Sequence, residues 1–406
     1  MNNYKRNYLL LFADSILFYN AMTFISINAV ITYFLNNLGA TTIQISLASA
    51  LVSIGNFIGQ PVFGKMSSQL KLKRDIFVKI LLIQRFLFLA FVISIPIFAV
   101  SNPERTIVLF LVSWGIFNFF TGSYQPFYVS IMTKMIPQEK RGRLIGYSGA
   151  VGNIIALSAA FFVGMILKHV RFPYNYTYIF GIGVIILLID AVDFLFMKEP
   201  PDKTVLENIS YIKYIMNIPN VLKENKNIKK LILGNTFVVI SNVVIIYCTL
   251  YAIRMYNAGS QQIAIFTALT VVMNILGLPI FGVIADHFGY RVVMLISSIC
   301  GMLSGIVILL MPSIYSVYVA FSFGNISASA YNLSCSMYIV QDSPQDKIPL
   351  NVSTNFMITL IASSFSMLVC GYITDNISFT PVFIFTSVAG LAAYAVFHSE
   401  GRLSKR

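Results

Sequence analysis

Long apolar stretches, separated by short polar segments, run through the whole chain. A helix needs about 20 mostly apolar residues to cross the hydrocarbon core of a bilayer, where it satisfies its own backbone polar groups. Twelve stretches reach that length and predict twelve transmembrane helices. They cover residues 8–35, 43–64, 76–100, 106–133, 144–167, 176–197, 231–253, 261–285, 292–312, 314–340, 350–374 and 379–398.

The composition places these helices in a lipid bilayer. Apolar residues make up 57% of the 406 residues and charged residues only 11%, whereas an average soluble domain carries about a quarter charged residues. So few charges cannot cover a water-exposed surface. We therefore expect an all-α polytopic membrane protein. The net charge of +13 does not indicate nucleic-acid binding, because the basic residues lie in short segments between the apolar stretches.

The positions of lysine and arginine predict the topology. If the N-terminus is cytoplasmic, 22 of the 28 basic residues lie in cytoplasmic segments and only four lie on the opposite side. Cytoplasmic loops carry such an excess, so both termini are expected in the cytoplasm. The first seven residues lead straight into a long apolar stretch that has no small-residue cleavage site, which favours an uncleaved first span. The Lys-, Asn- and Ile-rich composition favours a bacterial host, and hence the inner or plasma membrane.

The longest polar connection divides the twelve spans into six and six. It covers residues 198–230 and is basic, and either a surface helix or a solvated tether would fit its pattern. The predicted organisation is a six-helix bundle in 1–197, this central cytoplasmic loop, and a second six-helix bundle in 231–406.

The two halves also repeat in sequence. Residues 59–64 (GQPVFG) and 277–282 (GLPIFG) align without a gap at an offset of 218, and the same offset pairs Asn56 with Asn274. A second pair, 137–140 and 344–347, follows the fourth span of each half. These matches predict a duplication into two pseudo-symmetric halves of like orientation.

The loops after the second span of each half carry recognisable residues. The second half reads Gly282-Val-Ile-Ala-Asp286-His-Phe-Gly289-Tyr-Arg291, which resembles the GxxxDxxGxR/K loop of the major facilitator superfamily. The first-half counterpart starts at Gly64 but has Ser68 in place of the acid and Lys71 in place of the second glycine. The segment from Pro137 through Arg141 and Arg143 is also similar to a loop of that family. The resemblance implies the twelve-helix facilitator fold.

In the family, this loop network is taken to help hold the cytoplasmic side shut. Residues assigned to it are Gly64, Arg141, Arg143, Gly282, Asp286, Gly289 and Arg291. Gly282 and Gly289 suit close helix approach and a tight turn between two spans. For the arginines, plain anchoring at lipid phosphates is an equal alternative. In the first half, a charge-based latch would need an acid other than Ser68.

The resemblance further implies that spans 1, 4, 7 and 10 line a central cavity. Each of these spans carries polar residues at helical spacing. The candidate lining residues are Ser15, Tyr19, Thr23, Trp114, Asn118, Thr121, Gln125, Asn235, Asn242, Asn325, Ser329 and Asn332. Helix–helix packing is the alternative explanation for such stripes. As a lining, they would present amide, hydroxyl and aromatic groups with little charge.

Five charged residues lie inside spans, where a charge costs at least a few kcal/mol and is a functional candidate by default. Lys79, Asp190 and Asp193 are near the cytoplasmic end and are expected to reach the interface. Arg85 is deeper and needs a partner, which Asp14 of span 1 could supply. Two interpretations of Asp14 stay open: a protonatable coupling site and a static ion pair with Arg85.

These observations favour a secondary active or facilitated transporter that moves a small neutral, amphipathic or modestly polar solute by alternating access, with protons as a possible coupling ion. A multidrug/proton antiporter-type exporter is the alternative. Antiporters of that kind in the superfamily usually carry an arginine in span 4 and a glycine-rich motif with proline in span 5. Here the stripe of span 4 has no basic residue and span 5 has no proline, which counts against that subtype. Non-transporting alternatives are a membrane-embedded enzyme and a ligand-binding receptor. The three scattered histidines and the absence of HExxH or CxxC argue against an enzyme and give no metal or cofactor motif. A monomer is the family's usual state.

Overall fold

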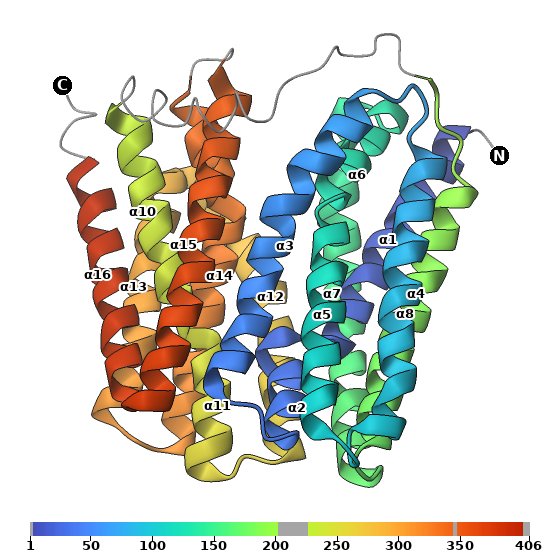
Figure 1. Cartoon of the computed structure of the whole chain (residues 1–406). Helices are drawn as coiled ribbons and strands as arrows, with labels where there is room; N and C mark the ends of the chain where they lie inside the picture. The colour runs from blue at the N-terminus through green and yellow to red at the C-terminus, as the bar shows by residue number, and fades with distance from the viewer. Residues whose placement is uncertain (1–2, 202–225, 344–346, 401–406) are drawn as a thin grey trace. The chain divides into compact units, whose positions relative to one another are not determined.

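The computed structural model describes residues 3–201, 226–343 and 347–400, and helices make up nearly all of that part of the chain (Figure 1). The helices of the first half are α1 (Asn3–Phe24), the π-helix η1 (Ile27–Ile31), α2 (Thr32–Asn37), α3 (Thr42–Ser68), α4 (Arg74–Phe98), α5 (Pro103–Thr121), α6 (Tyr124–Met135), α7 (Gln138–His169) and α8 (Tyr174–Leu195). Those of the second half are α10 (Lys226–Asn242), α11 (Val244–Tyr256), α12 (Ser260–Phe288), α13 (Tyr290–Leu310), α14 (Ile314–Gln341), α15 (Ile348–Asn376) and α16 (Thr380–Glu400).

All twelve predicted spans coincide with helical segments. Eleven segments of the described chain are long and apolar enough to cross a membrane. The twelfth, α14, is 28 residues long, but its serine, asparagine and tyrosine residues lower its hydropathy. Several helices extend beyond the apolar stretch into the neighbouring polar residues, because backbone hydrogen bonding does not stop where the bilayer core ends.

Three of the four spans expected to line a cavity are interrupted. Span 1 consists of α1, η1 and α2, with the first break at Ile25 and Ser26. Span 4 breaks at Gly122 and Ser123, and span 7 breaks at Val243. Span 10 is the single helix α14. Interrupted helices leave backbone polar groups without their usual intrahelical partners, and in membranes such breaks are tolerated where other groups satisfy them.

The chain forms two compact units. Unit 1 comprises Met1–Ala40 and Leu51–Tyr211, and unit 2 comprises Thr41–Ala50 and Ile212–Arg406. The division differs from a simple split at the central loop, because the first turns of α3 belong to unit 2. The rest of α3 belongs to unit 1.

The same helix pairings occur in both units. In unit 1, α1 packs against α7 and α8, and α4 packs against α5 and α8. In unit 2, α10 packs against α15 and α16, and α13 packs against α14 and α16. The second set is the first set moved on by six spans. The layout of two similar six-helix halves predicted from the sequence repeats is therefore confirmed.

The repeated glycines have the same structural role in each half. A Cβ added to Gly59 of α3 would collide with the carbonyl of Phe119 in α5, and Gly122 meets the backbone of Gly59 from the other side. In unit 2, a Cβ on Gly277 of α12 would collide with Ser329 of α14. The second and fourth spans of each half therefore approach closely at this level, which explains why glycine stands at both positions.

The N-terminus of α3 is held inside unit 2 by polar contacts. Asp375 of α15 accepts hydrogen bonds from the backbone N–H groups of Thr42 (2.9 Å) and Ile43 (2.8 Å). Arg254 of α11 lies 3.6 Å from Asp375 and donates to the Thr42 hydroxyl at 2.6 Å. A carboxylate at this position satisfies two N–H groups of the first turn and complements the positive end of the helix dipole.

Candidate functional site: a buried charged cluster and polar helix breaks

A cluster of charged side chains lies in the core of unit 1. Asp14 of α1, Arg85 of α4 and Asp190 of α8 are 0%, 2% and 0% exposed. Arg85 Nη2 donates to Asp190 Oδ2, and the two side chains form a buried ion pair. Burying a charge without a partner is strongly unfavourable, so this pair explains how Arg85 is accommodated deep in span 3.

Asp14 belongs to the cluster but is not the ion-pair partner of Arg85. Its carboxyl group accepts a hydrogen bond from the Tyr124 hydroxyl of α6, at 3.1 Å to Oδ2. It also lies within hydrogen-bonding reach of the Asp190 carboxyl group. The expected Asp14–Arg85 ion pair is therefore corrected: Asp190 forms it. The expectation that Asp190 reaches the membrane interface was wrong, because its side chain faces the packed interior of unit 1.

The other two charged residues of the spans are placed differently. Lys79 is exposed and Asp193 is half-buried. Both lie on the same helices as cluster members, α4 and α8, but on other faces. The periodicity of the sequence places Asp190 and Asp193 near each other, whereas only the packing of α8 against α1 and α4 distinguishes their environments.

The candidate lining residues fall into three groups by exposure. Thr23, Asn118, Asn235, Asn325 and Ser329 are buried. Ser15, Thr121 and Asn242 are half-buried, and Tyr19, Gln125 and Asn332 are exposed. Exposed amide and phenol groups on membrane helices are most stable where water reaches them. These last six candidates keep part of their surface exposed.

Trp114 does not line a cavity. Its side chain is 1% exposed and stacks on Phe117 (5.3 Å between ring centroids) and on Phe110 (5.8 Å). Phe88 of α4 packs against it as well. The tryptophan is therefore part of an aromatic core between α4 and α5. The helical spacing of the stripe is correct, but spacing alone does not tell a core face from a lining face.

Several buried polar atoms at the helix breaks lack a hydrogen-bond partner among the described residues. They are Ser123 Oγ at the break of span 4 and Ser241 Oγ and Asn242 Oδ1 beside the break of span 7. Leaving such a group unsatisfied costs about 1–3 kcal/mol. Water or a polar solute can supply the missing hydrogen bonds, so the breaks are candidate contact points in each unit.

In unit 2, an amide pair extends this polar set. Asn235 of α10 donates to Asn355 Oδ1 of α15 at 2.8 Å, while Asn235 Oδ1 and Asn355 Nδ2 have no partner among the described residues. Asn355 was missed by the sequence interpretation because span 11 was not among the four spans assigned to a cavity.

Two of the loop residues predicted to form a latch, Arg141 and Arg291, are helix-capping groups. Arg141 donates to the carbonyls of Ile136 (2.9 Å) and Thr133 (2.7 Å). Arg291 donates in the same way to the carbonyls of Phe397 (2.9 Å) and His398 (2.8 Å), at the end of α16. Both arginines thus cap the C-terminal ends of helices, where a cation is favoured.

The remaining predicted loop residues differ in how far the structure supports their roles. Gly289 has a φ of 81° and makes the tight turn between α12 and α13, as predicted. Gly64 and Gly282 have no other atom within 4 Å of an added Cβ, so the expected close approach at Gly282 was wrong. Arg143 and Asp286 are exposed.

Of the second repeat pair, residues 344–346 lie outside the described residues, as does most of the central loop.

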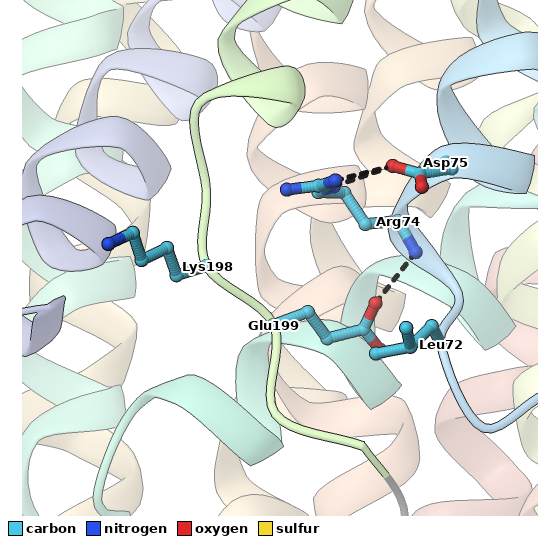
Figure 2. Close-up of a pocket in the computed structure, with 5 residues that line it drawn as sticks. All are labelled: Leu72, Arg74, Asp75, Lys198 and Glu199. Atoms are coloured by element: carbon cyan, nitrogen blue, oxygen red, sulfur yellow. Dashed lines mark hydrogen bonds and ion pairs between the residues drawn. The ribbon is translucent and has the colours of Figure 1, made fainter.

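An acid outside the first-half motif, Glu199, lies close to the loop that follows this motif. Its carboxylate accepts the backbone N–H groups of Lys73 and Arg74 at 2.8 Å each and forms an ion pair with Lys134 at 2.6 Å. Glu199 thereby caps the N-terminus of α4 and ties it to α6. Figure 2 shows Glu199 facing the backbone of Arg74, while Lys198 points away from both. Sequence reasoning missed Glu199. Its one hint was that Ser68 stands where the family motif has an acidic residue.

A cavity of about 290 Å³ adjoins this anchor and is lined by Leu72, Arg74, Asp75, Lys198 and Glu199 (Figure 2). Arg74 is already paired with Asp75 and bonded to the carbonyl of Met197. Asn7 of α1 forms two hydrogen bonds with the backbone of Lys198, at 2.9 and 3.0 Å. These contacts hold the start of the central loop against α1 and α4, so we assign the cavity to an anchor rather than to a solute site.

The fold defines the chain as a helical, multi-pass membrane protein. The family model of the Major Facilitator Superfamily matches residues 14–256 and 231–403. The chain therefore belongs to the Major Facilitator Superfamily. No curated protein sequence matches the chain.

Solved structures of transporters share the fold. A variant of the nucleoside transporter NupG has a TM-score of 0.75 at 12% identity, over 98% of this chain and 99% of that chain. The D-xylose-proton symporter gives 0.71 at 15% identity over 97% of both chains. A bacterial homolog of the human lysosomal transporter Spinster gives 0.67 at 14% identity, over 99% of this chain and 98% of that chain. At these identities the likeness shows the fold alone.

Proposed function

We propose that the protein is a secondary transporter that moves a small, uncharged polar solute across the membrane by alternating access. The observation that carries this proposal is the set of unpartnered polar atoms at the breaks of spans 4 and 7, Ser123 Oγ and Asn242 Oδ1. Alternating access moves two repeat-related halves about a fixed site, and interrupted helices commonly build that site. The six-span repeat of this chain fits such a mechanism.

The side chains near the breaks favour a neutral solute. In unit 1 the accessible residues are Ser15, Tyr19, Thr121 and Gln125, and in unit 2 they are Asn242 and Asn332. All six are hydroxyl, phenol or amide groups, which can both donate and accept hydrogen bonds. None carries a charge that would balance a charged solute. The Asp14–Arg85–Asp190 cluster is fully buried and does not present its charges to the surface of unit 1.

The solved relatives give two reasonable classes of neutral solute, since one is named as a nucleoside transporter and one as a D-xylose-proton symporter. Both solute classes are rich in hydroxyl groups and carry no net charge. We propose further that the protein acts without catalysing a reaction, as a monomer in the inner membrane of a bacterium, with both termini in the cytoplasm and the halves 1–197 and 231–406 as its moving parts.

The test is uptake by purified protein reconstituted in liposomes, with labelled uridine, labelled D-xylose and a cationic dye as separate probes. We expect one neutral probe to enter faster than into empty liposomes, and Gln125→Ala and Asn332→Ala each to reduce that rate. Tyr147→Ala, a change at an exposed position of α7 outside the polar stripes, serves as the control. Movement of the dye alone would replace the proposal with a drug exporter.

A further inference from the structure

The buried cluster of unit 1 contains more acid than base. Asp14 and Asp190 contribute two carboxyl groups and Arg85 contributes one guanidinium, and all three side chains are at most 2% exposed. If both acids were ionised, the cluster would carry a net negative charge in a medium of low dielectric constant. Because an unbalanced buried charge is strongly unfavourable, the neutral state of the cluster holds one proton.

The contacts indicate where that proton lies. Arg85 forms its ion pair with Asp190, which holds Asp190 in the ionised form. Asp14 makes no ion pair in the described structure and is bonded to the neutral hydroxyl of Tyr124. Two carboxyl groups within hydrogen-bonding reach of each other need a proton between them. Oδ1 of Asp190 takes no hydrogen bond from any other described residue and is free to accept one from Asp14.

The elements packed around Asp14 add no second positive charge. From α6, Tyr124 and Tyr128 face it, and from α8 only Asp190 does. From α7, Gly149 and Gly152 lie against α1, beside Tyr19. Asp193 is on α8 but half-buried and nearer to Asp190. Arg85 is thus the one described cation that balances the two acids.

A route toward the surface starts at the same residues. The ring of Tyr128 stacks on that of Tyr124 at 4.8 Å between centroids, and Tyr128 lies within hydrogen-bonding reach of Ser15. Both Tyr128 and Ser15 are half-buried, and Tyr19, one turn further along α1, is exposed. The buried carboxyl group is therefore separated from the accessible polar face of α1 by one layer of tyrosine.

We propose that Asp14 and Asp190 together bind one exchangeable proton opposite Arg85, and that this proton is the coupling ion of transport. The step is a protonation: a carboxylate oxygen of Asp14 takes H⁺ from water and later returns it, with no electron transfer and no other bond made or broken. The second part of the proposal depends on the transport function proposed above. The first part does not.

The proton can be counted without any solute. Infrared spectroscopy of the protein in lipid nanodiscs at neutral pH resolves the C=O band of protonated carboxyl groups. We expect a band from one buried group in the wild type, its loss in Asp14→Asn, and its loss in Asp190→Asn, where Asp14 must ionise to balance Arg85. Arg85→Gln should strengthen the band toward two groups. Asp193→Asn, the same change on the same helix, should leave it unaltered.

Absence of the band from the wild type would overturn the proton site, and so would a band unaffected by Asp14→Asn and Asp190→Asn. Because Asn has the shape of a protonated Asp, Asp14→Asn is expected to fold. Solute uptake driven by a pH gradient is then measured on the same variants. Loss of that uptake in Asp14→Asn, with solute exchange retained, supports the coupling role, and uptake that survives overturns it. If no solute moves but the band behaves as expected, the proton site stands and the transport function fails.

Discussion

The charge balance of the buried cluster makes the effects of its two acids on stability interdependent. Asp14→Asn replaces a neutral carboxyl group by a neutral amide and should cost about 1 kcal/mol, the value of one hydrogen bond. Asp190→Asn removes the ion-pair partner of Arg85, but Asp14 can ionise in its place, so we expect a loss of about 1–2 kcal/mol. The double variant leaves Arg85 buried without any counter-charge, which costs about 3–5 kcal/mol in addition to the hydrogen bond of about 1 kcal/mol lost at position 14.

The structure provides its own probe for this experiment. Trp114 is the only tryptophan of the chain and lies in the aromatic core of unit 1, against Phe88 of α4. Its fluorescence therefore reports the unfolding of the unit that contains the cluster. The four proteins of the cycle are compared by denaturant titration in mixed micelles at neutral pH. Free-energy losses that add up to within about 0.5 kcal/mol would refute the shared charge balance, because additivity means that the two acids act independently.

Three further changes test other parts of the structure. Gly59→Val should destabilise the protein by about 1–3 kcal/mol through overpacking against α5, whereas Gly64→Val, with no atom within 4 Å of its added Cβ, should have little effect in the same unfolding titration. Glu199→Gln should cost about 1.5–3 kcal/mol because a buried carboxylate loses charge-assisted hydrogen bonds; an unchanged unfolding curve would contradict its role as an anchor. Asp375→Asn should speed amide hydrogen exchange in the first turn of α3, measured by mass spectrometry, since an amide oxygen cannot replace both carboxylate oxygens; unchanged exchange would contradict the cap.

Hydrophobic patterning predicted the spans and the duplication well, because burial in lipid constrains every residue of a spanning helix. The repeat of Gly59 and Gly277 was visible in the sequence, and the structure gives its reason in the close approach of the second and fourth spans. Interruptions of spans 1, 4 and 7 were not predicted. Ser123 and Asn242 fit an intact amphipathic helix equally well, so only the backbone shows the break.

Side-chain partners were harder to predict than helices. The sequence showed that Arg85 needs a counter-charge, but three acids within the spans were available, and helix rotation decides which one it meets. Asp190 is paired because α8 turns that face toward α4, while Asp193, one turn away, remains half-buried. Trp114 illustrates the same limit, since a stripe at helical spacing marks a face without saying what lies opposite. Glu199 lies beyond the end of its helix, where periodicity gives no guidance.

Proton-coupled transport is tested most directly by solute uptake into proteoliposomes driven by an imposed pH gradient, compared between wild type and Asp14→Asn at equal protein content. We expect uridine or D-xylose to accumulate in wild-type liposomes when the gradient is applied and not when it is collapsed. Asp14→Asn should exchange the solute without accumulating it. Failure of both neutral solutes to move in the wild type, or accumulation by Asp14→Asn equal to the wild type, would contradict proton-coupled transport through Asp14.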